Sequence, residues 1–243
     1  MTTIIIFFIL HWYLSLFFQT FFLHRYGAHK MYSLSPTGEK VMYILNYFCS
    51  GSSYLSPRAY AILHRMHHAY SDTEKDPHSP HFFKDVVSMM VKTRVIYNRL
   101  YSRAQKPEKQ FENNLPDWDK FDKFADSVPS RLGWAFLYIL FYVYFAPYWW
   151  LYLLLPIHFL MGPVHGAIVN WCGHKYGYQN FDNQDKSRNT LVFDFLMLGE
   201  LFQNNHHKFP LSPNFAKKWW EIDPVYPVFK LFTWLGFIKP AKF

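Results

Sequence analysis

Histidines are the residues in this chain whose grouping could do chemistry. The sequence contains thirteen of them, and eight fall into four groups at the edges of apolar segments. These groups are His24 with His29, His64 with His67 and His68, His174, and His206 with His207. Imidazole is a good ligand for iron, copper and zinc, and eight imidazoles are more than one ion accepts. The grouping therefore predicts a site for two metal ions.

The spacing within each group sets a condition on the backbone. The three histidines of the second group fall within one helical turn and project from one side of a helix. His24 and His29 are five residues apart, so on a regular α-helix they diverge by about 140°. They share a site only if the helix ends between them, and Gly27 permits such a break.

Two further groups complete the set. Asn170 stands one helical turn before His174. His206 and His207 cannot share a helix face, which suits two neighbouring ions that each take one. A single buried histidine is explained more simply by a hydrogen bond to the backbone. Four groups favour metal binding instead, because the expected membrane topology places all of them on the same side.

Carboxylates lie near these histidines in the sequence. Asp72, Asp76 and Glu200 are placed where they could accept a hydrogen bond from an imidazole and fix its orientation and tautomer. Glu74 is a further candidate, although a solvated surface acid explains Asp72 and Glu74 equally well. The sequence contains no Glu-x-x-His, the pattern of soluble di-iron bundles.

The other five histidines are less suited to metal binding. His11, His158 and His165 lie inside apolar stretches, and His78 and His81 lie in a polar segment. Seven residues separate His158 from His165, so a continuous helix would place both on one face, away from the metal-binding groups. We interpret this pair as lining a pocket or packing between helices.

Several apolar segments are long enough to cross a membrane. Residues 3–23 are uncharged and roughly 20 long, enough for a bilayer core of about 30 Å. Arg25 and Lys30 follow and mark that end as cytoplasmic. Residues 132–155 and 156–172 predict a helical hairpin across the membrane.

The intervening segments predict a cap at the membrane surface. Residues 41–61 are apolar but interrupted from Gly51 to Pro57, which favours an interfacial or half-inserted helix. Residues 92–131 are polar and expected in the cytoplasm. Residues 216–242 mix tryptophan with lysine, as an interfacial amphipathic helix does.

Together these features predict an all-α integral membrane protein. We expect about three transmembrane helices and a cytosolic helical cap that holds a histidine-rich di-metal site. Three spans place the N-terminus on the outer side and the histidine groups on the cytoplasmic side. The chain length suits a single domain, residues 1–243. The net charge of +8 favours anionic lipid as a partner over nucleic acid.

Four stretches carry a resemblance to a known family: HRYGAH, HRMHHAYSDTEKDPHSP, NWCGHKYGYQNFDNQDKSRN and GELFQNNHHKFP. In this order they resemble the integral-membrane fatty acid desaturases, specifically the stearoyl-CoA desaturase branch. The resemblance covers most of the chain. It implies an enzyme of lipid metabolism that uses O2 and two iron ions to insert a cis double bond into a fatty acyl chain, at the delta-9 position of an acyl-CoA or a similar acyl thioester.

The resemblance also implies a ligand set. One iron would be held by His24, His29, His64, His68 and His207. The other would be held by His67, His174 and His206, with Asn170 acting through a water molecule. The family usually has histidine where this chain has Gln203, so Gln203 is a possible further metal contact.

The resemblance implies partners as well. The His-Pro-Gly-Gly of a fused cytochrome domain is not found, so electrons would come from a separate donor such as a ferredoxin, a rubredoxin or a cytochrome b5-type protein. The chain also begins at what resembles the second span of the family. The acyl substrate could be carried by CoA, by an acyl carrier or by a membrane lipid.

Two other functions fit the same residues. A fatty acid hydroxylase or related oxidase would use the same histidine groups and would yield an alcohol instead of an alkene. A non-catalytic lipid- or metal-binding membrane protein would hold metal without consuming oxygen, and Gln203 would then be a sign of lost activity.

Overall fold

The chain is built almost wholly from helices, and the predicted all-α fold is confirmed. The computed structural model describes residues 1–241. The helices are α1 (Thr2–Phe18), η1 (Gln19–Ala28), α2 (Pro36–Ser50), η2 (Gly51–Ser53), α3 (Pro57–Tyr70), α4 (Val86–Tyr101), η3 (Lys109–Phe111), α5 (Asp119–Ala125), α6 (Val128–Phe145), η4 (Trp149–Leu154), α7 (Leu155–Phe159), α8 (Met161–Lys175), α9 (Gln203–Lys208) and α10 (Tyr226–Trp234). The short strands β1 (Tyr32–Ser33) and β2 (Lys239–Pro240) pair antiparallel.

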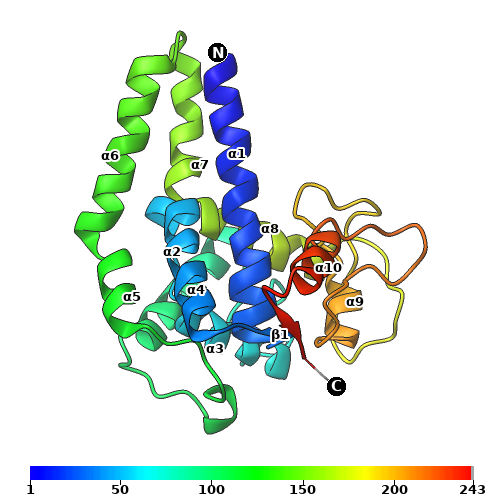
Figure 1. The fold of residues 1–243 in the computed structure, drawn as a ribbon. Coiled ribbons are helices and arrows are strands. Elements are labelled where there is room, and N and C mark those ends of the chain that lie inside the picture. Colours follow the sequence, from blue (N-terminus) through cyan, green and yellow to red (C-terminus); the bar gives the residue numbers. More distant parts are fainter. Residues whose placement is uncertain (242–243) are drawn as a thin grey trace.

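Three apolar helices form one end of the molecule. α1, α6 and α7 stand side by side, and most of the other elements gather at the opposite end from the N-terminus (Figure 1). Within residues 1–241, Thr2–Ala28 and Val128–Phe145 are long and apolar enough to cross a membrane. The pair Trp149–Phe159 and Met161–Lys175 makes a third span if its 73° bend is counted within one crossing. The apolar helices therefore fit a membrane protein. In the predicted hairpin, the second helix is bent between α7 and α8 instead of being continuous.

Polar residues and a glycine set the helix boundaries near the site. Ser35 and Ser56 cap α2 and α3 by accepting a backbone N–H, and a proline follows each at the start of the helix. α2 ends before Gly51, whose φ is 53° and where a Cβ would collide with the hydroxyl of Tyr138. The interruption expected within residues 41–61 is therefore present.

The C-terminal segment differs from the amphipathic helix expected over residues 216–242, of which residue 242 lies outside the described part. Helix forms in α10, while the residues before it make a loop. Glu221 and Asp223 explain this loop, because each carboxylate accepts hydrogen bonds from two backbone N–H groups of the segment. Backbone donors that bind carboxylates in this way are not available to a helix.

A large aromatic core holds η1 against the C-terminal half of the chain. Its fully or nearly fully buried rings come from η1, β1, α2, α10 and the segments flanking α9: Phe21, Phe22, Tyr32, Tyr43, Phe202, Phe215 and Phe229. Burying a side chain of this size contributes about 1.5–3 kcal/mol. Because η1 and α9 both carry histidines, this core fixes the two helices relative to each other.

A hydrogen-bonded junction fixes the start of α3, the helix that carries three histidines. Ser56 Oγ and the Tyr54 hydroxyl each donate to the Asp122 carboxylate at 2.6 Å. The Ser56 backbone N–H donates to the Tyr97 hydroxyl on α4 at 2.8 Å. Burial raises the pKa of Asp122 to about 6, although its two hydroxyl donors oppose the shift. The Asp122 carboxylate thus connects the start of α3 to α5, and the Tyr97 hydroxyl connects the start of α3 to α4.

We expect Asp122→Ala to destabilise the protein measurably. The change leaves the buried hydroxyls of Tyr54 and Ser56 without their acceptor, at a cost of about 1–3 kcal/mol for each unpaired group. Asp119→Ala on the same helix is the matched control, since the Asp119 side chain is 43% exposed and pairs with Lys123 at the surface. Thermal unfolding in detergent should show a lower midpoint for the first variant alone. Equal midpoints would contradict the junction.

Candidate metal centre

The eight grouped histidines of the sequence lie in two adjacent clusters. Cluster A consists of His24, His29, His64, His68 and His206, and cluster B of His67, His174 and His207. Within each cluster, one nitrogen of every ring lies within 4.8 Å of the others. The clusters adjoin, because the rings of His68 and His207 have centroids 4.4 Å apart. The structure thus gathers residues from η1, α3, α8 and α9 at one place.

A π-helix brings His24 and His29 together, where the sequence led us to expect a helix end at Gly27. In η1 the backbone hydrogen bonds span five residues, and the His29 N–H donates to the His24 carbonyl at 3.1 Å. This wider turn removes most of the divergence of about 140° expected on a regular α-helix, and the rings of His24 and His29 have centroids 4.9 Å apart. η1 continues to Ala28, and the expected break is therefore not needed.

The two histidines of α9 are exchanged relative to the assignment that the resemblance implied. That assignment placed His207 with His24 and placed His206 with His67. In the structure His206 belongs to cluster A and His207 to cluster B. Adjacent helical residues point about 100° apart, so the sequence requires them to face different ions but does not say which faces which.

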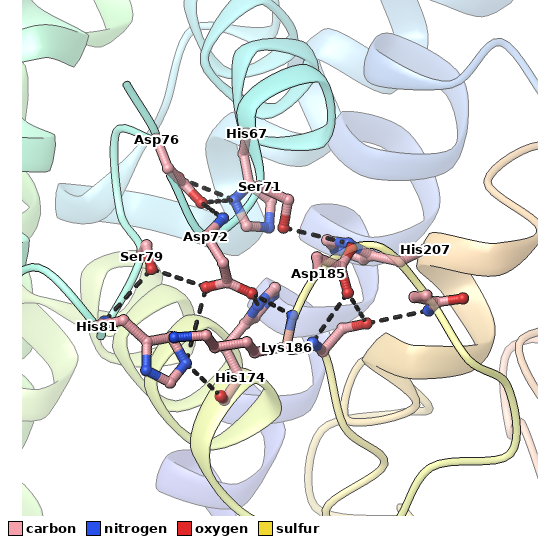
Figure 2. A network of polar contacts seen from close by, with 12 residues as sticks. His67, Ser71, Asp72, Asp76, Ser79, His81, His174, Asp185, Lys186 and His207 are labelled. Atoms are coloured by element: carbon pink, nitrogen blue, oxygen red, sulfur yellow. Dashed lines mark hydrogen bonds and ion pairs between the residues drawn. The ribbon is translucent and has the colours of Figure 1, made fainter. Parts of the chain in front are cut away.

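Each histidine of cluster B is held by its own aspartate (Figure 2). Nδ1 lies 2.9 Å from a carboxylate oxygen of Asp76 for His67, 2.9 Å from Asp72 for His174 and 2.6 Å from Asp185 for His207. The Nε2 atoms of all three rings are buried and have no hydrogen-bond partner among residues 1–241. A neutral imidazole that donates from Nδ1 has its lone pair on Nε2. Cluster B thus presents three converging lone pairs.

Cluster A is held mainly by contacts among its own rings. His24 Nδ1 lies 2.8 Å from Glu200, which also accepts hydrogen bonds from Thr20 and Arg25. The facing Nε2 atoms are 2.8 Å apart for His29 and His64. His206 Nε2 lies 3.0 Å from the Nε2 atoms of both His24 and His68.

The pKa values keep four histidines of cluster A neutral and the aspartates of cluster B charged. Burial, and then the neighbouring histidines, lower the pKa of His29, His64, His68 and His206 well below the ordinary value. Burial alone would raise the pKa values of Asp72, Asp76 and Asp185, but the histidines beside them outweigh burial and hold these pKa values low. Neutral imidazole is the form that binds a metal.

The donor set fits two metal ions. Converging Nε2 atoms without other partners, with Nδ1 tied to a carboxylate, are the arrangement of metal-binding histidines. Buried polar atoms without partners are otherwise rare and costly. Cluster A could hold one ion and cluster B a second, and all-nitrogen donors suit iron, copper or zinc.

Gln203 and Asn170 lie beside the clusters. The Gln203 amide donates to the Glu200 carbonyl at 2.6 Å, and its side chain packs against Gly173, where a Cβ would collide with it. Asn170 is partly buried on α8, one turn before His174. Whether either residue contacts a metal stays a prediction.

An apolar cavity adjoins cluster A. Its volume is about 730 Å³, and its walls come mainly from α3, α4 and α8. Most lining side chains are apolar, while His64, Glu200, Gln203 and Asn170 form a polar part of the wall. A separate polar hollow is lined by His207 of cluster B and by Asp185. Cluster A thus borders the apolar cavity, and cluster B borders the polar hollow.

The remaining histidines lie apart from clusters A and B or at their edge. His11 and His158 face each other with their Nδ1 atoms 2.6 Å apart, and His165 packs against Trp12. These contacts agree with a packing role. His158 and His165 do not share a helix face, because the bend at Leu160 separates α7 from α8.

The sequence pointed to three of the four acids that contact the clusters. Asp72, Asp76 and Glu200 contact His174, His67 and His24, whereas Glu74 is exposed. Asp185 was not singled out, because it stands 22 residues before His207 and no local spacing links the two.

Comparison with known proteins agrees with this architecture. A family model described as fatty acid desaturase matches residues 2–232. The chain is 29% identical over 237 residues to a delta-9 desaturase-like 5 protein of Arabidopsis thaliana, covering 92% of this chain and 71% of that protein. It is 28% identical over 226 residues to an sn-1 stearoyl-lipid 9-desaturase of Synechocystis sp., covering 90% and 65%.

A third relative carries a different name. The chain is 28% identical over 256 residues to a hex-5-enoyl-[acyl-carrier protein] acetylenase of Moorena producens, covering 95% of this chain and 74% of that protein. The names of the relatives thus differ in acyl carrier and in reaction. The chain spans about two thirds to three quarters of the length of these relatives.

We expect Asp185→Asn to weaken metal retention at cluster B by about 10–100-fold, the usual effect of altering the partner of a metal-binding histidine. Asparagine keeps the size of the side chain but removes the charge that fixes His207. Asp182→Asn is the matched control, because Asp182 lies three residues away and is exposed. Dialysis against graded chelator, followed by metal analysis, measures the effect. Retention equal to that of the control would remove Asp185 from the site.

Proposed function

We propose that this chain, which belongs to the fatty acid desaturase family, uses O2 to introduce a cis double bond into a fatty acyl chain. The observation that supports this proposal most is the meeting of two histidine clusters with an apolar cavity. We further propose the delta-9 position of an acyl-CoA or a similar acyl thioester. Two of the relatives carry a 9-desaturase name, while their acyl carriers vary.

Two iron ions fit the proposed reaction, and the residues of both clusters would hold them. Iron supplies the redox chemistry with O2 that removal of hydrogen from an unactivated methylene requires. His24 and the other members of cluster A bring one set of nitrogen donors, and the three aspartate-held rings of cluster B bring the other. The chain's contribution is to fix these donors by hydrogen bonds to their other ring nitrogens and by burial.

The cavity beside cluster A would position the acyl chain. Apolar walls from α4 and α8, such as Met90 and Val164, favour a hydrocarbon chain over water. His64 marks the place where this cavity reaches the histidines. A carbon pair held there lies beside the donors of cluster A while the remaining chain extends between the helices. Exclusion of water protects the reacting centre.

We propose that the clusters face the cytoplasm and that the N-terminus lies on the outer side. The α1–η1 helix separates the N-terminus from His24 by one crossing (Figure 1). Lysines and arginines concentrate in residues 84–131 at the end that carries the clusters, as expected for the cytoplasmic side. Arg25 does not contribute to this argument, because it is fully buried against Glu200 and Asp223.

We expect cells that express the chain to accumulate a new cis-monounsaturated acyl chain. His67→Ala and His206→Ala should each abolish the product while the protein still inserts into the membrane, because each removes a donor from one cluster. Lipid profiling with assignment of the double-bond position measures the outcome. A hydroxylated acyl chain would show the alternative reaction on the same scaffold. Oxygen consumption or product equal to wild type in either variant would overturn the assignment of that histidine.

We expect a reporter fused to the N-terminus to act on the outer side of the membrane. A periplasmic-type reporter that is inactive in the cytoplasm, placed before Met1, should therefore be active. The same reporter inserted into the exposed loop near Asp182 is the matched control and should be inactive. An inactive reporter at both positions would show that α1 and η1 do not cross the membrane.

A further inference from the structure

His78 is buried without any hydrogen bond to its ring. The residue lies in the turn after α3 and is 4% exposed. Neither ring nitrogen has a partner within the described part of the chain. An imidazole buried in this way loses its hydrogen bonds to water and gains none in return, which costs free energy. A bound metal ion or another ligand would therefore stabilise the His78 ring, because the polar groups of the described residues do not bind it.

His78 lies at the edge of cluster B. Its ring packs against that of His67 with centroids 4.3 Å apart. One ring nitrogen lies within 4.8 Å of a nitrogen of His67 and an oxygen of Asp76. The His78 backbone N–H also donates to Asp76 at 2.9 Å, so the carboxylate that orients His67 also fixes the His78 backbone. The side chain lines the apolar cavity at this point.

Cluster B has fewer imidazole donors than cluster A. It contains three imidazoles, against five in cluster A. Gln203 in α9 is the alternative that the sequence suggested, but its amide N–H donates to the Glu200 carbonyl. An amide oxygen is also a weaker donor than imidazole for the metals that such a site suits. A fourth nitrogen for cluster B is therefore more readily supplied by His78.

We propose that His78 is a fourth imidazole ligand of the metal ion held by cluster B. This inference rests on the proposed function, because it requires two bound ions. The nitrogens of His78 group with His67 and Asp76, so the ring must turn toward the Nε2 atoms of cluster B to bind. No hydrogen bond holds the ring back, since both nitrogens lack partners among residues 1–241. The unfavourable burial of the unpaired His78 ring in the metal-free protein is then offset when the ring binds the metal ion.

The key variant is His78→Phe. Phenylalanine preserves a buried ring against His67 but carries no nitrogen. If His78 only fills space, replacing unpaired polar atoms with carbon should leave metal content unchanged and raise stability. If His78 is a ligand, the purified protein should lose about half of its metal per chain, because cluster B loses a donor and cluster A does not. His78→Ala repeats the test without the ring volume.

Two further variants give the control and the rescue. His165→Phe is the matched control, because His165 is also fully buried with both ring nitrogens unpaired in the described structure but packs against Trp12, away from the clusters. It should retain the metal content of the wild type. His78→Phe combined with Gln203→His places an imidazole in α9 beside cluster B, and it should restore most of the lost metal.

Metal per chain is measured after iron loading and chelator challenge, without substrate or reductant, and Mössbauer spectra count the distinct iron sites. Full metal content in both His78 variants would overturn the proposal, and so would an equal loss of metal in the His165→Phe control. If the wild-type protein and the His78→Phe variant both hold two irons, His78 is not a ligand, and the proposed function is unaffected. A wild-type protein that binds fewer than two ions rejects the di-metal function itself.

Discussion

The hydrogen bond from an imidazole Nδ1 to a buried carboxylate is the interaction on which this structure depends. It fixes the tautomer of each ring and turns the Nε2 lone pair toward the cluster. The carboxylates need support of their own. Asp76 accepts from the backbone N–H groups of Asp72 and His78, and Asp185 accepts from the Ser187 N–H. The loops before α4 and after α8 are therefore shaped by the need to hold aspartates, and through them histidines.

Arg25 extends the same constraint to the C-terminal segment. Its guanidinium is fully buried, contacts Glu200 and donates to Asp223 at 2.8 Å. A buried cation is costly unless it is paired, and removal of one partner leaves an uncompensated charge. Asp223 also accepts the Phe215 backbone N–H and so folds the loop before α10 against η1. The orientation of His24 by Glu200 thus depends on a segment that contains no histidine.

The sequence was sufficient for what depends on local spacing and insufficient for what depends on tertiary contact. The apolar lengths predicted the spans, and the spacing of His64 and His68 predicted a shared helix face. The π-helix that aligns His24 and His29 could not be predicted, because nothing in five residues distinguishes a widened turn from a helix end. The choice between His206 and His207 depends on how α9 is rotated, and contacts distant in sequence, such as that of Gln203 with Gly173, contribute to this rotation. Asp185 contacts His207 because the loop after α8 folds back against α9, and no local spacing in the sequence indicates this contact.

The two clusters place any bound cation in different electrostatic surroundings. In cluster B each of the three imidazoles has its own aspartate, so three negative charges lie one ring away from the donors. In cluster A the carboxylate of Glu200 contacts one of the five imidazoles, that of His24, and its charge is already paired with Arg25. At such short range in a buried site, this difference favours positive charge at cluster B over cluster A. The apolar cavity meets cluster A at His64 and also runs past His78 at the edge of cluster B, whereas the polar hollow meets cluster B at His207. A hydrocarbon chain in the cavity therefore lies against both clusters, while the hollow gives water and charge a route to cluster B.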